Sequence, residues 1–176
     1  LTVHPRPDER HIKHNDLELI KNITDQYKKE FNIEGNPLEE RSQSYVGFME
    51  IIRKYKPTQT TLVPDSTSQI TSDHGWEMTE VNNLDLTKEV RQNSVRCSIF
   101  VDADLDLNLL TNKDINAIEI YTGPYAQAVL ENNNKQIESE VEKIKNLSLK
   151  AKELGLRVNA GHDLNLENLP ELRKLD

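Results

Sequence analysis

The chain has 176 residues and a formal net charge of −8, with 35% hydrophobic and 30% charged residues. This composition is typical of one folded domain with a real core, and it excludes a disordered or membrane-embedded class. An acidic chain gives no reason to expect a nucleic acid or an anionic membrane as partner, because either would need a basic face. Any phosphate-binding site must therefore be local.

Six short apolar or β-branched runs alternate with longer segments of helical periodicity, which is the pattern of successive βα units and a parallel sheet. The runs cover residues 1–4, 31–34, 58–63, 96–102, 117–122 and 156–162. Their starts lie about 31 residues apart, as expected when about 250 residues are shared among eight barrel units. Polar residues gather where the runs end, which is the face where parallel-sheet enzymes keep their sites.

The first run ends at His4 and continues into a loop that carries Arg6, Arg10 and His11. Two prolines stiffen this loop, so it predicts a compact cationic cluster suited to a phosphate ester or carboxylate. A solvated charged loop is the alternative, and His4 alone could be a hydrogen-bonded strand-end histidine. The helix that follows should bury one stripe, formed by Ile20, Ile23 and Tyr27.

The second run places Asn32 and Glu34 on one side of a strand. Partial burial would raise the pKa of Glu34 and make it a usable general base, whereas an ion pair with an arginine of the first loop is the competing interpretation. Pro37 and the acids after it predict a helix start at 37–40. A second helical stripe should contain Tyr45, Phe48, Ile52 and Tyr55.

The third run is followed by residues 65–75, a stretch that contains several Ser and Thr residues, among them Thr71, and ends at Gly75. A water-excluding lid is the function we expect for it. In the fourth run, Cys97 is expected to be a buried, inert thiol, since a single cysteine forms no internal disulfide. The chain contains no bilayer-spanning apolar stretch and no signal-peptide pattern, so we expect a cytoplasmic protein.

The fifth run puts Glu119 and Tyr121 on one side of a strand. The helix after it should bury Ile137, Val141, Ile144, Ala151 and Leu154 and should end at Gly155. The sixth run ends at His162, where small residues would let a ligand approach the backbone. His162 could equally be a satisfied core histidine.

Two folds fit this order of elements. A (β/α)8 barrel needs eight strands, so six of its βα units would be represented here and the single domain 1–176 would be incomplete at both ends. A doubly wound open sheet could be built from six units, but no Gly-x-Gly-x-x-Gly or Walker-type loop follows any strand. The five histidines include no His-x-His or His-Glu-x-x-His pattern, and we therefore expect no metal.

Several strand-end motifs, in this order, resemble those of the pyridoxine 5'-phosphate synthase family. They are His-Pro-Arg-Pro-Asp-Glu-Arg-His at 4–11, Asn-Ile-Glu at 32–34, Leu-Val-Pro at 62–64, Phe-Val-Asp-Ala-Asp at 100–104, Glu-Ile-Tyr-Thr-Gly at 119–123 and Asn-Ala-Gly-His at 159–162. The resemblance implies an octameric (β/α)8 barrel that condenses 1-deoxy-D-xylulose 5-phosphate with 3-amino-2-oxopropyl phosphate. Pyridoxine 5'-phosphate, phosphate and water would be the products, and no cofactor would be needed.

The resemblance also implies a role for each matching residue. His4 and Glu34 would accept protons, His162 would donate one, and Glu119 would stabilise charge in the transition state. Substrate binding would fall to Arg6, His11 and Thr71 for the deoxyxylulose phosphate and to Asp163 for the amino ketone phosphate.

The chain departs from the family's pattern at three places. Asp163 stands where a glycine is common, which puts a role for its side chain in doubt. The family's first and last strands are expected outside residues 1–176, and we predict that this segment alone has no activity. The alternative functions are a non-catalytic phosphate-binding barrel and another sugar-phosphate lyase or epimerase of the same fold.

Overall fold

The computed structural model describes residues 1–81 and 86–175 and contains one parallel sheet. All six predicted strands are present and pair in chain order; they are β1 (Thr2–Val3), β2 (Asn32–Gly35), β3 (Gln59–Leu62), β4 (Arg96–Val101), β5 (Ala117–Tyr121) and β6 (Arg157–Gly161). A doubly wound sheet would reverse its strand order at a switch point. The sequential order therefore rules out that alternative.

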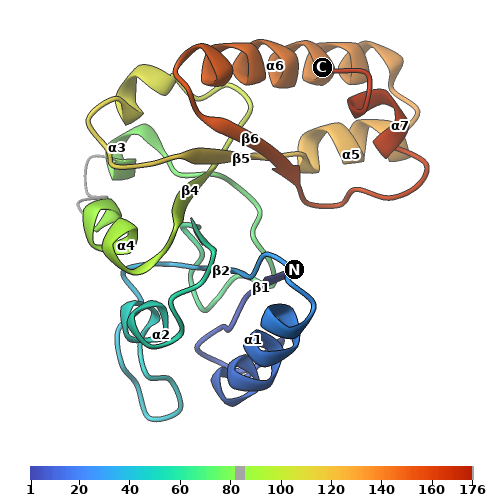
Figure 1. The fold of residues 1–176 in the computed structure, drawn as a ribbon. Coiled ribbons are helices and arrows are strands. Elements are labelled where there is room, and N and C mark those ends of the chain that lie inside the picture. Colours follow the sequence, from blue (N-terminus) through green and yellow to red (C-terminus); the bar gives the residue numbers. More distant parts are fainter. Residues whose placement is uncertain (82–85, 176) are drawn as a thin grey trace.

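The sheet curls into a half-barrel with its helices on the outside (Figure 1). The helices are α1 (Leu17–Gln26), α2 (Phe48–Tyr55), α3 (Met78–Val81), α4 (Thr87–Asn93), α5 (Gly123–Leu130), α6 (Asn134–Glu153) and α7 (Leu169–Leu172), with 3-10 turns η1 (His14–Asp16) and η2 (Leu107–Leu110). This alternation of strand and covering helix is compatible with a (β/α)8 barrel, of which the described residues form six strands.

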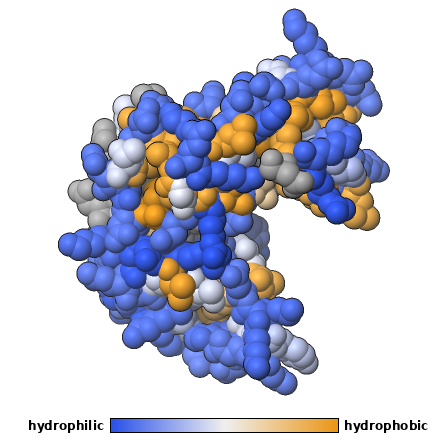
Figure 2. Space-filling view, turned by 45° about the horizontal axis from the view of Figure 1, so that its top comes forward, coloured by the Kyte–Doolittle hydropathy of each residue, from blue (hydrophilic) through white to orange (hydrophobic). Residues whose placement is uncertain are grey.

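The two faces of the sheet differ in chemistry. Alternate residues such as Ile33, Ile99 and Ile118 are fully buried in the apolar core beneath the helices. The opposite face is concave and polar, and Figure 2 shows the molecule hollowed on one side. Polar side chains line a cavity of about 550 Å³ there, among them Asn32, Gln59, Arg96, Glu119 and Asn159. Most of these residues lie at the starts of the strands, away from the strand ends that carry the predicted site.

The helical stripes were predicted with mixed success. Tyr45, Phe48, Ile52 and Tyr55 are all buried, as expected. The stripe on α1 was wrong, because Ile23 and Tyr27 are 45% and 64% exposed. The buried positions of this helix are Leu17 and Thr24, with Ile20 packed against the core. On α6, Ile144 and Ala151 are buried, but Leu154 lies beyond the last helical residue and is 44% exposed.

The predicted helix start at 37–40 was also wrong, since α2 begins at Phe48. The side chain of Asn36 accepts a hydrogen bond from the backbone N–H of Leu38 at 2.9 Å, which closes a turn in place of a helix. The chain then folds back, and the N–H of Phe48 donates to the carbonyl of Glu39. Residues 36–47 are therefore a compact loop.

Two local predictions were confirmed. Gly155 follows α6 with φ +74°, a conformation that an L side chain rarely adopts. Cys97 is fully buried and free, and burial raises the pKa of its thiol to about 12, which keeps it unreactive. Among the described residues, no helix is both long enough and apolar enough to cross a bilayer.

Candidate active site

The ends of β1 and β2 place His4 beside Glu34. Val3 pairs with Ile33 in the parallel register, so the residues that follow them emerge next to each other. His4 Nδ1 lies 3.3 Å from Glu34 Oε1, and the two side chains are 11% and 22% exposed. This pair brings a histidine and a carboxylate together at the carboxyl ends of the strands, which form the mouth of the half-barrel. Both groups lie within reach of a ligand there.

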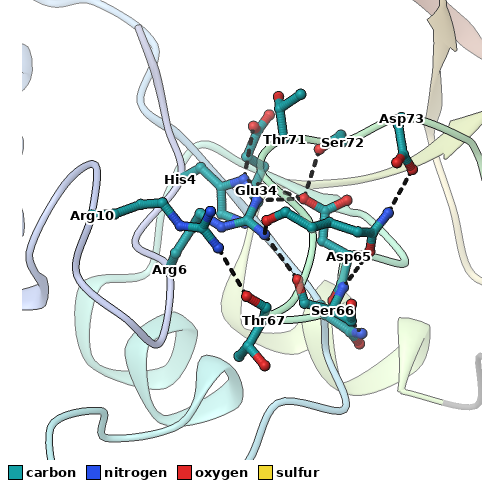
Figure 3. Close-up of polar contacts among 12 residues, drawn as sticks. His4, Arg6, Arg10, Glu34, Asp65, Ser66, Thr67, Thr71, Ser72 and Asp73 are labelled. Atoms are coloured by element: carbon teal, nitrogen blue, oxygen red, sulfur yellow. Dashed lines mark hydrogen bonds and ion pairs between the residues drawn. The ribbon is translucent and has the colours of Figure 1, made fainter.

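Arg6 forms a buried ion pair with Asp65, a residue that follows β3 (Figure 3). Its Nη1 donates to Asp65 Oδ2 at 2.7 Å, and its Nη2 donates to the carbonyls of Ser66 and Gln69, each at 3.0 Å. The arginine is 2% exposed and the aspartate 3%. In this conformation Arg6 fixes loop 65–69. The competing interpretation from the sequence paired Glu34 with an arginine of the first loop, but the acid that pairs with Arg6 is Asp65.

Asp65 was not singled out from the sequence, although it belongs to the predicted lid stretch. Ser72 Oγ donates to the same Oδ2 atom at 2.8 Å, and His4 Nδ1 lies 3.9 Å from it. Asn36 Nδ2 also donates to the Asp65 carbonyl at 3.0 Å. One pattern could have revealed this residue, because an acid within three residues of the end of the third strand lies near the same edge of the sheet as the other predicted site residues.

The rest of the predicted cationic cluster is more exposed. Arg10 Nη2 donates to the carbonyl of Thr67 at 2.9 Å (Figure 3). Arg10 is also paired with Asp8. His11 lies exposed at the start of the following turn. Arg6 and Arg10 thus both bind backbone oxygens of the loop after β3, and both have acidic partners. In this conformation the cluster is less available to bind an anion than the sequence predicts.

Glu119 lies on β5, next to β6. Burial of its carboxyl raises the pKa to about 7, and the nearby charge of Glu34 adds to the effect. Gly161 makes this burial possible, because a Cβ atom at Gly161 would lie only 2.6 Å from Glu119 Oε1. A carboxyl that changes its protonation state near neutrality is suited to acid–base chemistry.

His162 follows β6 and faces the loop after β3. Its Nε2 is 2.9 Å from Thr71 Oγ1, a contact between residues 91 positions apart. The imidazole packs edge-on against Tyr121, with ring centroids 5.3 Å apart, and Phe100 lies beyond at 6.5 Å. Thr71 therefore joins the two sides of the mouth, and two predicted site residues meet there.

The backbone at His162 has an unusual conformation. His162 and Asp163 have φ of +91° and +56°, values that favour glycine. Thr122 Oγ1 lies 2.6 Å from the carbonyl oxygens of both Gly161 and His162, to which it donates. Asp163 is exposed, with Oδ2 3.1 Å from His162 Nδ1. Thr122, which the sequence analysis missed, is thus the buried group that holds this turn.

The described residues contain no group of three or more His, Cys, Asp and Glu side chains arranged to hold a metal ion. The candidate site consists of acids, histidines and hydroxyl groups from β1, β2, β5, β6 and the loop after β3. Its chemical capacity is proton transfer.

Comparisons with known proteins show the family of the chain. The profile of the family described as "Pyridoxal phosphate biosynthesis protein PdxJ" matches residues 1–176. A pyridoxine 5'-phosphate synthase of Parabacteroides distasonis is 43% identical over 99% of this chain and 68% of its own length. The synthase of Mesorhizobium japonicum is 41% identical over 99% of this chain and 69% of its own length.

A solved structure confirms the fold class alone. The EAL enzyme Bd1971, in a cGMP-bound form, superposes with a TM-score of 0.57 at 14% identity. The match covers 92% of this chain and 42% of that protein.

The family profile and the two synthases, unlike this structure, match in sequence over nearly the whole chain. On these matches, the chain belongs to the PdxJ family of pyridoxal phosphate biosynthesis proteins, a family of enzymes whose curated members include pyridoxine 5'-phosphate synthases.

Proposed function

We propose that the protein is a pyridoxine 5'-phosphate synthase that condenses 1-deoxy-D-xylulose 5-phosphate with 3-amino-2-oxopropyl phosphate. Addition of an amine to a ketone, elimination and ring closure need repeated proton transfers and no redox step. The observation that carries the proposal is the His4–Glu34 pair, 3.3 Å apart, beside a Glu119 carboxyl with a pKa of about 7. Family membership supports the same conclusion.

Each acid–base group has a proposed role. His4 Nδ1 faces Glu34, which leaves Nε2 to accept a proton from substrate, and Glu34 is the second acceptor. His162 donates a proton from the opposite side, through its Nε2 atom, which lies next to the Thr71 hydroxyl. Glu119 stabilises the developing charge, because its carboxyl takes up or releases a proton near neutral pH.

Substrate binding is proposed for Arg6, His11 and Thr71 on one side and for Asp163 on the other. Arg6 is occupied by loop carbonyls, so it reaches a substrate phosphate only if loop 65–69 exchanges those contacts. This requirement supports a lid role for residues 65–75. Limited proteolysis tests the lid, because cleavage in this loop should slow when both substrates are bound; unchanged cleavage contradicts it.

The assembly belongs to the same proposal. Two further βα units would close the six strands into an eight-stranded barrel, and the closed barrels would form a cytoplasmic homo-octamer. Light scattering of the complete protein measures the oligomer directly. A monomer at working concentration would contradict the octamer and leave the catalytic proposal unaffected.

The decisive experiment is a synthase assay on the complete protein, with product identified by mass. His4→Ala and Glu34→Ala should each lower kcat by about 10²- to 10⁴-fold while calorimetry still detects substrate binding. His14→Ala is a matched control, because this histidine pairs with Glu9 outside the strand ends. Full activity in both variants would falsify the catalytic roles.

The same experiment separates the alternatives. Binding without turnover would indicate a non-catalytic phosphate-binding barrel. Turnover of a different sugar phosphate without formation of a pyridine ring would indicate a lyase or epimerase of the same fold.

A further inference from the structure

Asp65 connects three segments that are far apart in the sequence. Its Oδ2 atom accepts from Arg6, 59 positions earlier, and from Ser72, seven positions later, and it faces His4 (Figure 3). Its backbone carbonyl accepts from Asn36 in the loop after β2. Asp65, through its carboxylate and its backbone carbonyl, thus holds together the loops that follow β1, β2 and β3.

The Arg6–Asp65 pair is not arranged for maximum stability. Among the described residues, neither Arg6 Nε nor Asp65 Oδ1 has a hydrogen-bond partner, although both atoms are buried. A buried ion pair with unsatisfied atoms pays a desolvation penalty that a well-packed apolar pair would avoid. Its presence beside His4 therefore indicates a role in the site.

The position of Asp65 relative to His4 suggests that role. Two carboxylates face the Nδ1 side of the ring, Glu34 at 3.3 Å and Asp65 at 3.9 Å. Glu34 is a proposed proton acceptor, and it loses its negative charge when it takes up a proton. A second carboxylate, fixed by Arg6 and Ser72, would keep the ring oriented through that step.

We propose that Asp65 is a positioning residue of the synthase site, which orients His4 through its carboxylate and couples that orientation to the docking of loop 65–72. Asp65 touches neither substrate nor product in this role. The inference rests on the proposed function for its catalytic consequence, but the contact between Asp65 and His4 can be tested independently of activity.

The test compares Asp65→Asn, which removes the charge and keeps the shape, with Asp25→Asn on the exposed surface of α1. Asp25 is a suitable control because it is exposed and forms an ion pair with Lys21 on the same helix, outside the strand ends and the proposed lid. In the complete protein, Asp65→Asn should lower kcat by about tenfold or more and change KM by less than about threefold. Asp25→Asn should change both by less than about twofold.

Histidine-selective ¹⁵N NMR supplies the readout that a purely structural role would not move. Asp65→Asn should shift the ring nitrogen resonances of His4 and leave those of His14 in place, whereas Asp25→Asn should shift neither. A folded Asp65→Asn protein with unchanged His4 resonances or unchanged kcat would overturn the proposal.

Removal of one member of a buried pair can prevent folding. In that case Ser72→Ala replaces it, because this variant removes one bond to Oδ2 and retains the ion pair. The His4 resonances should shift and kcat should fall by about threefold at unchanged KM; unchanged resonances would again overturn the proposal. If the unsubstituted protein makes no pyridoxine 5'-phosphate, the proposed function fails, while the NMR comparison still decides the contact.

Discussion

The two sides of the mouth hold their histidines by different physical means. On the side of β1–β3, His4 lies among charged groups, with Glu34 and the buried Arg6–Asp65 pair around it. On the side of β5–β6, His162 is held by aromatic rings, by the hydroxyl of Thr71 and by a backbone turn of positive φ. Proposed proton acceptors thus lie beside a buried ion pair, whereas the proposed donor lies among aromatic rings and a hydroxyl, and the carboxylate nearest to it belongs to the exposed Asp163.

This difference indicates how each side should respond to substitution. Removal of one partner from a buried ion pair leaves the other charge buried and uncompensated, which is strongly destabilising. The β1–β3 side should therefore be sensitive to the loss of a single charge. Neutral hydrogen bonds and backbone strain contribute about 1–2 kcal/mol each, so the β5–β6 side should change in smaller steps. Four substitutions test this contrast, in order of expected effect.

Arg6→Met should have the largest effect, because it leaves the Asp65 carboxylate buried without its cation. The free energy of unfolding, measured in urea, should fall by about 3–5 kcal/mol. Arg10→Met is the matched control, since Arg10 pairs with Asp8 at the surface and should lose at most about 1 kcal/mol. Equal losses in the two variants would contradict the ionic description of this side.

Glu119→Gln should change how stability depends on pH. The carboxyl pKa rises from 4.5 in the unfolded chain to about 7 in the folded protein, so the folded state binds more protons between these values. The stability contributed by this group is therefore fully present below pH 4.5 and is lost as pH rises towards 7. The free energy of unfolding should fall by at most about 3 kcal/mol over this range. The free energy of unfolding, measured at several pH values, should rise for the variant relative to the parent protein as pH increases over that range. An exposed acid on α6, replaced in Glu138→Gln, should show no such gain.

Thr122→Val removes the hydroxyl that donates to the carbonyls of Gly161 and His162. We expect a loss of about 1–2 kcal/mol in the free energy of unfolding, because the partly buried His162 carbonyl loses its donor, whereas the Gly161 carbonyl still accepts from the backbone N–H of residue 122. Thr111→Val provides the comparison, since its hydroxyl donates to the Asn108 carbonyl at an exposed turn and should matter by less than about 0.5 kcal/mol. If both variants lose the same amount, the turn at His162 is not held by Thr122.

Asp163→Gly should have the smallest effect and the opposite sign. Glycine adopts φ of +56° without strain, so the variant should gain about 0.5–1 kcal/mol of stability, less any contribution from the Asp163–His162 contact. Asn132→Gly relieves a similar φ of +53° after α5, far from the mouth. A smaller gain for Asp163→Gly than for Asn132→Gly, by thermal unfolding, would show that the contact with His162 stabilises the fold.

Sequence reasoning was most successful where one local rule governs one element. All six strands, the buried stripe from Tyr45 to Tyr55, the turn at Gly155 and the buried Cys97 follow from periodicity or from the properties of one residue. The same rules placed His4, Glu34 and His162 at or next to the ends of strands, where the structure has them, whereas Glu119 lies in the middle of β5. Their catalytic roles remain predictions.

Asp65 and Thr122 were missed for the same physical reason, because the importance of each depends on contacts between distant residues. Asp65 is a buried partner of Arg6, but in the sequence it is an ordinary loop acid 59 residues away. Thr122 looked like the last residue of a strand, and its hydroxyl gains importance only from a turn some 40 residues later. The exposed Ile23 and Tyr27 show the converse, since helical spacing cannot tell which of two apolar stripes will face the sheet.

The chain-order pairing of the strands has a consequence for how the protein folds during synthesis. Each strand finds its sheet neighbour in the unit made just before it, so the sheet can grow one βα unit at a time as the chain leaves the ribosome. The bond between Thr71 and His162 is an exception, since it spans 91 residues and needs all six strands in place. Closure across the mouth would therefore be among the last steps of folding, so that partly made chains would contain the His4 side without its partner.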